Sequence, residues 1–342
     1  MKPPAKRLCT LIGPLLMLLL SGLPLQPALG ATALNVSIAV FDPGVPEDPA
    51  LHRDLQVFPR IREVEAMLLP FVLRETLAAT GEWGAVRVVP EPDAAAELLV
   101  TGAIGQSDGE TLQVDIRAVD ASGRLWLDRA FFGVPGDRTF YSQIAAELRQ
   151  ARAGLNEKAL DDIVEISLLR YGNRLAPSAF GEYLREAADG AVEVRRLPAT
   201  NDPMVGRIKR LRETEYVITD AVDTKFQELH REIASVHEVW REYRRKNIQY
   251  REGDARRAQA TMGDAPRGSY EALRNLYDNY KFDRITAQEQ DRLAVAFNNE
   301  VGPKVEAMEA RVAELEGWVD EKYAEWNRIL EELFEVETAF EE

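Results

Sequence analysis

The feature that most constrains the fold is a run of apolar residues near the carboxyl end of the chain. Between residues 305 and 340 this run advances by alternating steps of three and four, and ten of its eleven positions are apolar. Such a spacing is the heptad seam of a coiled coil, because it places the apolar side chains on one side of a helix. The sequence therefore predicts a long helix that packs against a partner. The positions of the seam are Val305, Met308, Val312, Leu315, Val319, Lys322, Trp326, Ile329, Leu333, Val336 and Phe340.

A second seam of the same kind lies earlier, at residues 222–250. Asp202 and Pro203 predict the N-cap and first turn of its helix, and the glycines of residues 253–268 predict the turn that follows it. We expect the two seams to pack antiparallel as a helical hairpin, with self-association of either seam as the main alternative. The positions of this seam are Val222, Phe226, Leu229, Ile233, Val236, Trp240, Tyr243 and Tyr250, with Asn247 in one slot.

Between the turn and the second seam, two return helices are expected at residues 269–280 and 286–301. Aromatic residues are unusually frequent for a coiled coil, and several of them occupy seam positions, such as Trp240, Tyr243 and Trp326. We expect these large rings to widen the hairpin into a bundle of three or four helices. A ligand groove between the helices is the alternative explanation for the same rings.

Residues 34–170 predict a small α+β head in front of the helical arm. Alternating apolar residues and turn signals predict five strands, at 36–41, 85–89, 97–106, 111–119 and 125–133. Helices are expected at 60–80 and from residue 140 into the 160s, which gives the order β-α-β-β-β-α of a sandwich with helices on one mixed sheet. Residues 171–201 are expected to be a linker with one helix near 179–188, and residues 202–342 the coiled-coil domain.

The head resembles a group of bacterial envelope domains. The opening strand reads Ile38-Ala39-Val40-Phe41, residues 97–105 read Glu-Leu-Leu-Val-Thr-Gly-Ala-Ile-Gly, and residues 119–124 read Val-Asp-Ala-Ser-Gly-Arg. This pattern is similar to the amino-terminal domain of TolB, the curli-secretion protein CsgG and the penicillin-binding-protein activator LpoB. It covers about residues 36–135, with Glu97 where the family often has Asp. The resemblance implies a protein–protein interaction module of the envelope.

The first thirty residues have the pattern of a cleavable export signal. Positive charges precede an apolar run at residues 11–23, and small residues precede a cut after Gly30. A cut after Ala31 or Ala33 is a close alternative. The run is shorter than the ~20 residues of a spanning helix, so an uncleaved anchor is the less favoured interpretation. Cys9 precedes the apolar run, which excludes a lipoprotein signal. We therefore expect a periplasmic or otherwise exported protein.

Composition excludes several classes of function. The chain has 57 acidic and 42 basic residues and a net charge of −15, and a nucleic-acid-binding protein needs a basic face instead. Its single Cys excludes a disulfide framework and any Cys-based metal site. Removal of the signal would leave 39 basic and 57 acidic residues, a net charge of −18, and no Cys. The lack of thiols fits an oxidising envelope compartment.

No catalytic, metal or cofactor site is predicted. His230 and His237 share a helix face but are seven residues, about 10 Å, apart, which is too far for one metal ion. The remaining candidate is a basic cluster on the first seam helix, expected to be a solvated face or, in a sharper interpretation, a surface that contacts lipid headgroups or an acidic partner. The cluster comprises Arg241, Arg244, Arg245, Lys246 and Arg251.

These observations together favour a non-enzymatic scaffold or adaptor of the bacterial cell envelope. Its partners would be other envelope proteins, a second copy bound through the helical seams, or the membrane surface. The alternative is a small-ligand or lipid-binding protein that uses the aromatic helical bundle. The seam positions expected to carry either function are Phe226, Leu229, Ile233, Val236, Trp240, Tyr243, Val312, Leu315, Val319, Trp326, Ile329 and Leu333.

Overall fold

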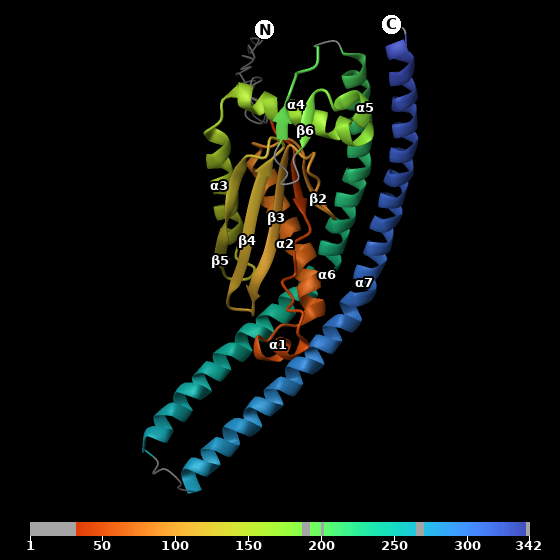
Figure 1. Ribbon diagram of the computed structural model, residues 1–342. Helices are drawn as coiled ribbons and strands as arrows, with labels where there is room; N and C mark the ends of the chain where they lie inside the picture. The colour runs from red at the N-terminus through yellow and green to blue at the C-terminus, as the bar shows by residue number, and fades with distance from the viewer. Residues whose placement is uncertain (1–31, 187–191, 200–201, 265–269, 340–342) are drawn as a thin grey trace, which may run out of the picture. The chain divides into compact units, whose positions relative to one another are not determined.

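Five strands form one mixed sheet at the centre of the amino-terminal half (Figure 1). The computed structural model describes residues 32–186, 192–199, 202–264 and 270–339, so the expected export signal lies outside the described residues. The strands lie in the order β2-β1-β3-β4-β5, and β1 pairs in parallel with both β2 and β3. The predicted strands are confirmed to within two residues. Their bounds are β1 Val36–Ala39, β2 Val86–Val89, β3 Leu98–Ser107, β4 Leu112–Asp120 and β5 Leu125–Gly133.

Two tight turns join the antiparallel strands β3, β4 and β5, as predicted. Gly109 and Gly123 have φ angles of 102° and 84°, a region that residues with a Cβ atom rarely adopt. In the second turn the Asp120 carboxylate accepts hydrogen bonds from the backbone N–H groups of Ser122 and Arg124, at 2.9 and 3.1 Å. These local contacts explain why the turn residues could be found in the sequence.

Helices cover one face of the sheet. The apolar sides of α2 and α3 pack on β1, β3, β4 and β5 and enclose the main core of the head. The single helix predicted from residue 140 is two helices, because the chain turns at Gly154 and the Asn156 side chain then caps a new helix by accepting from the Ala159 N–H at 2.8 Å. The helices are α1 Pro49–Asp54, α2 Pro59–Thr80, α3 Arg138–Ala153 and α4 Glu157–Leu175.

The connecting segment differs from its prediction. The helix expected near residues 179–188 is wrong, because a short helix, α5 Pro177–Phe180, is followed by β6 Leu184–Glu186. This strand pairs antiparallel with β7 Val192–Val194, and residues 187–191 lie outside the described part. The strand is held by pairing with residues further along the chain, which local helix propensity does not report.

Two long helices, α6 Pro203–Asp264 and α7 Tyr270–Ala339, form the predicted antiparallel hairpin (Figure 1). The Asp202 cap is confirmed, since its carboxylate accepts from the Met204 N–H at 2.8 Å. The prediction of two separate return helices is wrong, because α7 is one helix of 70 residues that continues through Pro303. An internal proline costs about 3 kcal/mol; burial of Val301 and Val305 on either side offsets that cost.

The turn predicted from residue 253 also begins later, since α6 continues to Asp264. The hairpin is not separate from the head in its packing. One apolar cluster joins α2 with α6 and α7, and it includes Phe71, Phe226 and Phe297. All described residues belong to one compact unit.

Helix α6 also closes one edge of the sheet. The Asp223 carboxylate accepts from the backbone N–H of Val88 in the edge strand β2, at 2.8 Å. The same carboxylate pairs with Arg74 of α2 at 2.7 Å, and Asp220 pairs with Arg87 of β2 at 2.5 Å. An uncovered edge strand is a site of unwanted pairing with other chains. The two aspartates therefore protect β2 as well as anchoring α6.

Candidate interaction surface

The first candidate surface is the pair of predicted seams, and it is largely buried within the chain. Phe226, Leu229, Ile233 and Trp240 are buried, and Val236 packs against the same cluster. Their partners are α2 and residues 294–312 of α7, so the pairing region of α7 begins before the predicted seam. This part of the structure, residues 218–240 with residues 294–312, is called the proximal hairpin below. Its seam is a core and offers no free surface.

Along α7 the buried face leaves the predicted seam. Val312 is buried, and the seam positions Leu315, Val319 and Trp326 are half-buried. The other inward residues, Tyr323, Leu330 and Phe334, each lie one position after a predicted seam position. Predicted Ile329 is exposed, and Leu333 is half-buried. A straight helix has 3.6 residues per turn and drifts about 20° per heptad from a strict 3.5 repeat. Over several heptads the drift moves the buried face by one position. The C-terminal apolar positions are thus divided between core and surface.

The predicted basic cluster is not brought together as one exposed surface. Arg244 is buried, with its guanidinium over Phe58 and Trp240 and 3.2 Å from the Gln56 side-chain oxygen. Arg241 is half-buried and pairs with Glu238. Arg245 is half-buried as well, while Lys246 is exposed and pairs with Glu242 at 2.7 Å. The side chain of Arg251 lies outside the described part. Arg244 therefore fixes α6 to the loops of the head, a role that charge counting did not suggest.

A buried polar group under α6 was missed by the sequence analysis. Glu65 of α2 is buried, and one of its carboxylate oxygens is 2.9 Å from the Ser107 hydroxyl and 3.1 Å from the His237 Nε2. Arg62 lies 3.8 Å from the other oxygen. A glutamate on the inward face of a predicted helix was the signal available. The serine hydroxyl donates to the carboxylate, and the histidine contacts the same oxygen, so the arrangement joins α2, β3 and α6.

A second polar cluster ties four segments together beside a pocket of ≈ 410 Å³. Arg212 of α6 is buried and pairs with Asp93 at 3.0 Å and Glu215 at 3.1 Å. Glu215 accepts a 2.7 Å hydrogen bond from Tyr323 of α7, and Arg174 of α4 pairs with Asp93 at 3.0 Å. Burial alone would raise the pKa of Asp93, but Arg212 and Arg174 outweigh it and hold that pKa below its ordinary value. The cluster connects α4, α6, α7 and the loop after β2.

The far part of the hairpin carries a different surface. Residues 250–285, called the distal hairpin below, expose a row of apolar side chains on the described part of α7. Leu273 is 67% exposed and Tyr277 62% exposed. In Figure 1 no other element lies beside this end of the two helices. The exposed residues of α7 are Tyr270, Leu273, Leu276, Tyr277, Tyr280 and Ile285, and Tyr250 of α6 is exposed as well.

The spacing of this row is that of an interface. Tyr270, Leu273, Tyr277 and Tyr280 follow steps of three, four and three. Tyr277 lies nine residues before the buried Thr286, a rotation of about 180°, so the row points away from the core. A helix that is apolar outside as well as inside is normally buried, and Tyr is among the residues enriched at protein interfaces. The row, called the tip stripe below, is the best candidate interaction surface.

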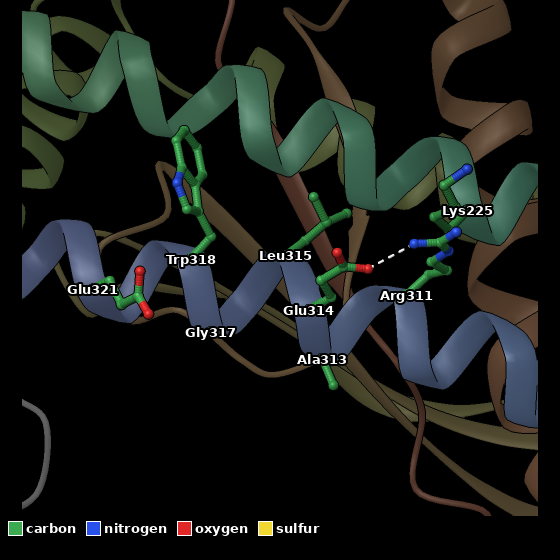
Figure 2. A pocket seen from close by; sticks show the side chains of 8 residues that line it. All are labelled: Lys225, Arg311, Ala313, Glu314, Leu315, Gly317, Trp318 and Glu321. Carbon is green, nitrogen blue, oxygen red and sulfur yellow. Dashed lines mark hydrogen bonds and ion pairs between the residues drawn. The ribbon is translucent and has the colours of Figure 1, made fainter.

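An open groove of ≈ 690 Å³ lies between α6 and α7 at residues 311–321 of α7 (Figure 2). Figure 2 shows the side chains of Leu315 and Trp318 projecting from α7 toward α6. Trp318 is 46% exposed. Arg311 pairs with Glu314 at 2.7 Å, and Lys225 of α6 lies on the opposite wall. The groove thus has an apolar floor with charged borders.

Within the described residues, no group of three or more His, Cys, Asp and Glu side chains is placed to hold a metal ion. The histidines have structural contacts there: the His230 ring lies 4.8 Å from that of Phe71, where burial lowers its pKa, and His52 contacts the Pro46 carbonyl at 2.7 Å. In the same part of the chain no helix is both long and apolar enough to cross a membrane.

No protein-family model matches the chain, and no curated protein matches it.

Proposed function

We propose that this protein is an exported scaffold or adaptor of the bacterial cell envelope that acts by protein–protein interaction and not by catalysis. The observation that carries the proposal is the tip stripe, a row of exposed rings and aliphatic side chains at coiled-coil spacing. Exposed apolar rows of this kind are stabilised by a partner. The resemblance of residues 36–135 to envelope interaction domains and the export pattern of residues 1–30 support the same proposal.

Crosslinking in living cells tests the proposal. A photo-reactive amino acid replaces Tyr277 in the tip stripe, and a matched control carries it at Val239, which is 60% exposed on α6 but outside the stripe. We expect a crosslinked protein product from position 277 that position 239 does not give. Fractionation of the same cells should find the chain in the envelope without residues 1–30. Equal labelling at both positions, or a cytoplasmic chain, contradicts the proposal.

The groove between α6 and α7 supports a second candidate, a small-ligand or lipid-binding protein. Leu315 and Trp318 form an apolar floor in a space of ≈ 690 Å³, which is within the size range of ligand pockets. This candidate predicts that the chain purified from cells carries a molecule extractable with organic solvent and detectable by mass spectrometry. The Trp318→Ala variant should lose that molecule, whereas Tyr277→Ala should retain it. An empty wild-type chain contradicts the candidate.

A further inference from the structure

The seam between α6 and α7 changes from apolar to polar at one level of the hairpin. Within the described residues, the apolar cluster that α2 forms with the two helices ends at Trp240 on α6 and at Leu293 on α7. Arg244, the next buried residue of α6, is directed to Phe58 and Gln56 of the head. The buried residues beyond it, called the polar layer below, are Asn247, Thr286 and Gln290.

Two side-chain amides of the polar layer face each other across the hairpin. The rings of Trp240 and Phe297 lie 6.1 Å apart, which fixes the register of the two antiparallel helices at that level. Asn247 and Gln290 each lie seven residues, about two helical turns, further toward the tip on their own helices. The two amides are therefore opposite each other, at a level where an apolar seam would place aliphatic side chains.

The polar layer stabilises the closed hairpin poorly. In the described part of the chain, the Asn247 Oδ1 and the Gln290 Nε2 are buried and have no hydrogen-bond partner. A buried polar atom without a partner has lost its hydration and gained no bond in exchange. A polar residue at a seam position also lowers the stability of a coiled coil. Contact between the helices is therefore weaker at this level than in the apolar cluster beside it.

Beyond the polar layer, α6 has no apolar residues with which to continue the seam. Residues 251–261 read Arg-Glu-Gly-Asp-Ala-Arg-Arg-Ala-Gln-Ala-Thr, without one large apolar residue. Most of the stability of a helix in a protein comes from the packing of an apolar face rather than from helix propensity. In Figure 1 no other element lies beside this end of the two helices. The distal hairpin is therefore held much more weakly than the proximal hairpin.

We propose that residues 247–290, the polar layer together with the distal hairpin, open by local unfolding as one unit while the head and the proximal hairpin stay folded. Parts of a protein with few buried apolar contacts open in this way, often as whole supersecondary motifs. The inference goes beyond the proposed function and does not depend on it. It has one consequence for that function: a partner that binds the folded tip stripe stabilises the closed unit, so binding and ordering are linked.

Native-state hydrogen exchange of the full chain, measured by mass spectrometry of its peptides, tests the proposal. We expect the protection factors of backbone amides in residues 247–264 and 270–290 to be at least about 100-fold lower than those of residues 222–240. The values should agree between the two helices and should change in one step at the polar layer. Equal protection of the two hairpins would overturn the proposal. A gradual decline from the polar layer to the tip would overturn it too, because fraying is not the opening of a unit.

A double variant tests the role of the facing amides. Asn247→Leu/Gln290→Leu extends the apolar seam by one level, and it should raise the protection of residues 247–290 by about 10-fold or more on both helices. The matched control, Gln249→Leu/Gln288→Leu, adds the same side chains at exposed positions in the same turns. Its protection should change by less than about threefold, since Gln and Leu have similar helix propensities. An equal gain in both double variants would overturn the proposal.

A substitution in the core of the head tests whether the unit opens by itself. Leu77 is fully buried there, and Leu77→Ala should lower protection in the most stable segments of the head by about 30-fold or more. Residues 247–290 should keep their wild-type protection, because Leu77 stays packed when only the unit opens. A parallel fall at residues 247–290 would show that they open only with the whole protein, and would overturn the proposal. These exchange experiments and the crosslinking at position 277 have separate readouts, so the two proposals can fail independently.

Discussion

The proximal and distal hairpins are parts of the same two helices, yet they differ in what covers them. In the proximal hairpin, α2 lies over both helices and buries rings such as Trp240 and Phe297. In the distal hairpin, rings of similar size such as Tyr277 remain exposed. Two helices alone can bury only the faces that they turn toward each other, and a third element is needed to cover the rest. The difference shows that apolar spacing reports a need for contact without naming the partner.

The largest expected effect is a loss of stability on substitution in the core of the proximal hairpin. Phe297 is 3% exposed and packs against Trp240, so Phe297→Ala should lower the free energy of unfolding by about 3–5 kcal/mol. Val295, two residues earlier on the same helix, is 57% exposed, and Val295→Ala should change it by less than about 0.5 kcal/mol. Urea unfolding followed by circular dichroism measures both. Similar losses from the two variants would show that α7 does not pack on α2 as described.

The next effect concerns a contact between the β3–β4 turn of the head and α6, close to the start of the distal hairpin. Gly109 has a positive φ, and a Cβ atom there would lie 2.8 Å from the backbone nitrogen of Arg245. Gly81 also has a positive φ but nothing within 4 Å of that position. Gly81→Ala should cost about 1 kcal/mol of stability for the strained conformation alone. Gly109→Ala should cost about 1–3 kcal/mol more, because backbone must also move. If Gly109→Ala and Gly81→Ala had equal midpoints of thermal unfolding, the turn at Gly109 would not be in close contact with α6.

A smaller effect tests the charged anchor between the head and the hairpin. The pKa of Asp93 lies below its ordinary value in the folded chain, so its contribution to stability is present above about pH 4 and is lost as the pH falls through the folded pKa. Asp93→Asn should therefore be less stable than wild type at pH 7 and should show a shallower loss of stability below pH 4. Asp162, in an exposed pair with Lys158, provides the control. If Asp93→Asn and Asp162→Asn give the same acid profile, the anchor is not formed.

The smallest expected effect on stability comes from a substitution in the distal hairpin. Leu273 is exposed in the single chain, so Leu273→Ser should leave the free energy of unfolding of the monomer within about 0.5 kcal/mol of wild type. The same substitution on the buried proximal side would be costly. Unfolding at low protein concentration, where association is absent, measures it. A loss above about 1.5 kcal/mol would mean that the distal apolar row is buried within the chain and is not an exposed surface.

The sequence predicted those parts of the fold that depend on nearby residues. The five strands, the turns at Gly109 and Gly123 and the cap at Asp202 were all found, because alternation, positive φ and capping are local properties. The helix near residues 179–188 was not, since β6 is held by β7. The predicted α7 seam lost its register after Trp326, because a straight helix follows 3.6 residues per turn rather than 3.5. The packing of α2 against both α6 and α7 could not be predicted either, because these contacts join residues that are far apart in the sequence.

The candidate site was predicted less well than the fold for a physical reason. The basic residues near Arg244 were treated as one charged surface, but guanidinium groups can be buried when rings and backbone carbonyls surround them. The tip stripe lay in a segment predicted only as a short return helix. Its apolar spacing was present in the sequence, but only the tertiary structure shows that nothing within the described chain covers it. Exposure, and not residue type, distinguishes the stripe from the core.

The closure of the β2 edge has a consequence for the order of events when the chain is made. Asp223 caps the Val88 N–H from a position 135 residues further along the chain. During synthesis, all five strands of the sheet emerge before the residue that covers this edge. Until then β2 presents unpaired backbone groups, which are a template for aggregation in a partly completed chain. We therefore expect chains that stop before residue 220 to depend on chaperones for solubility, and chains that extend past residue 225 to be released from that dependence.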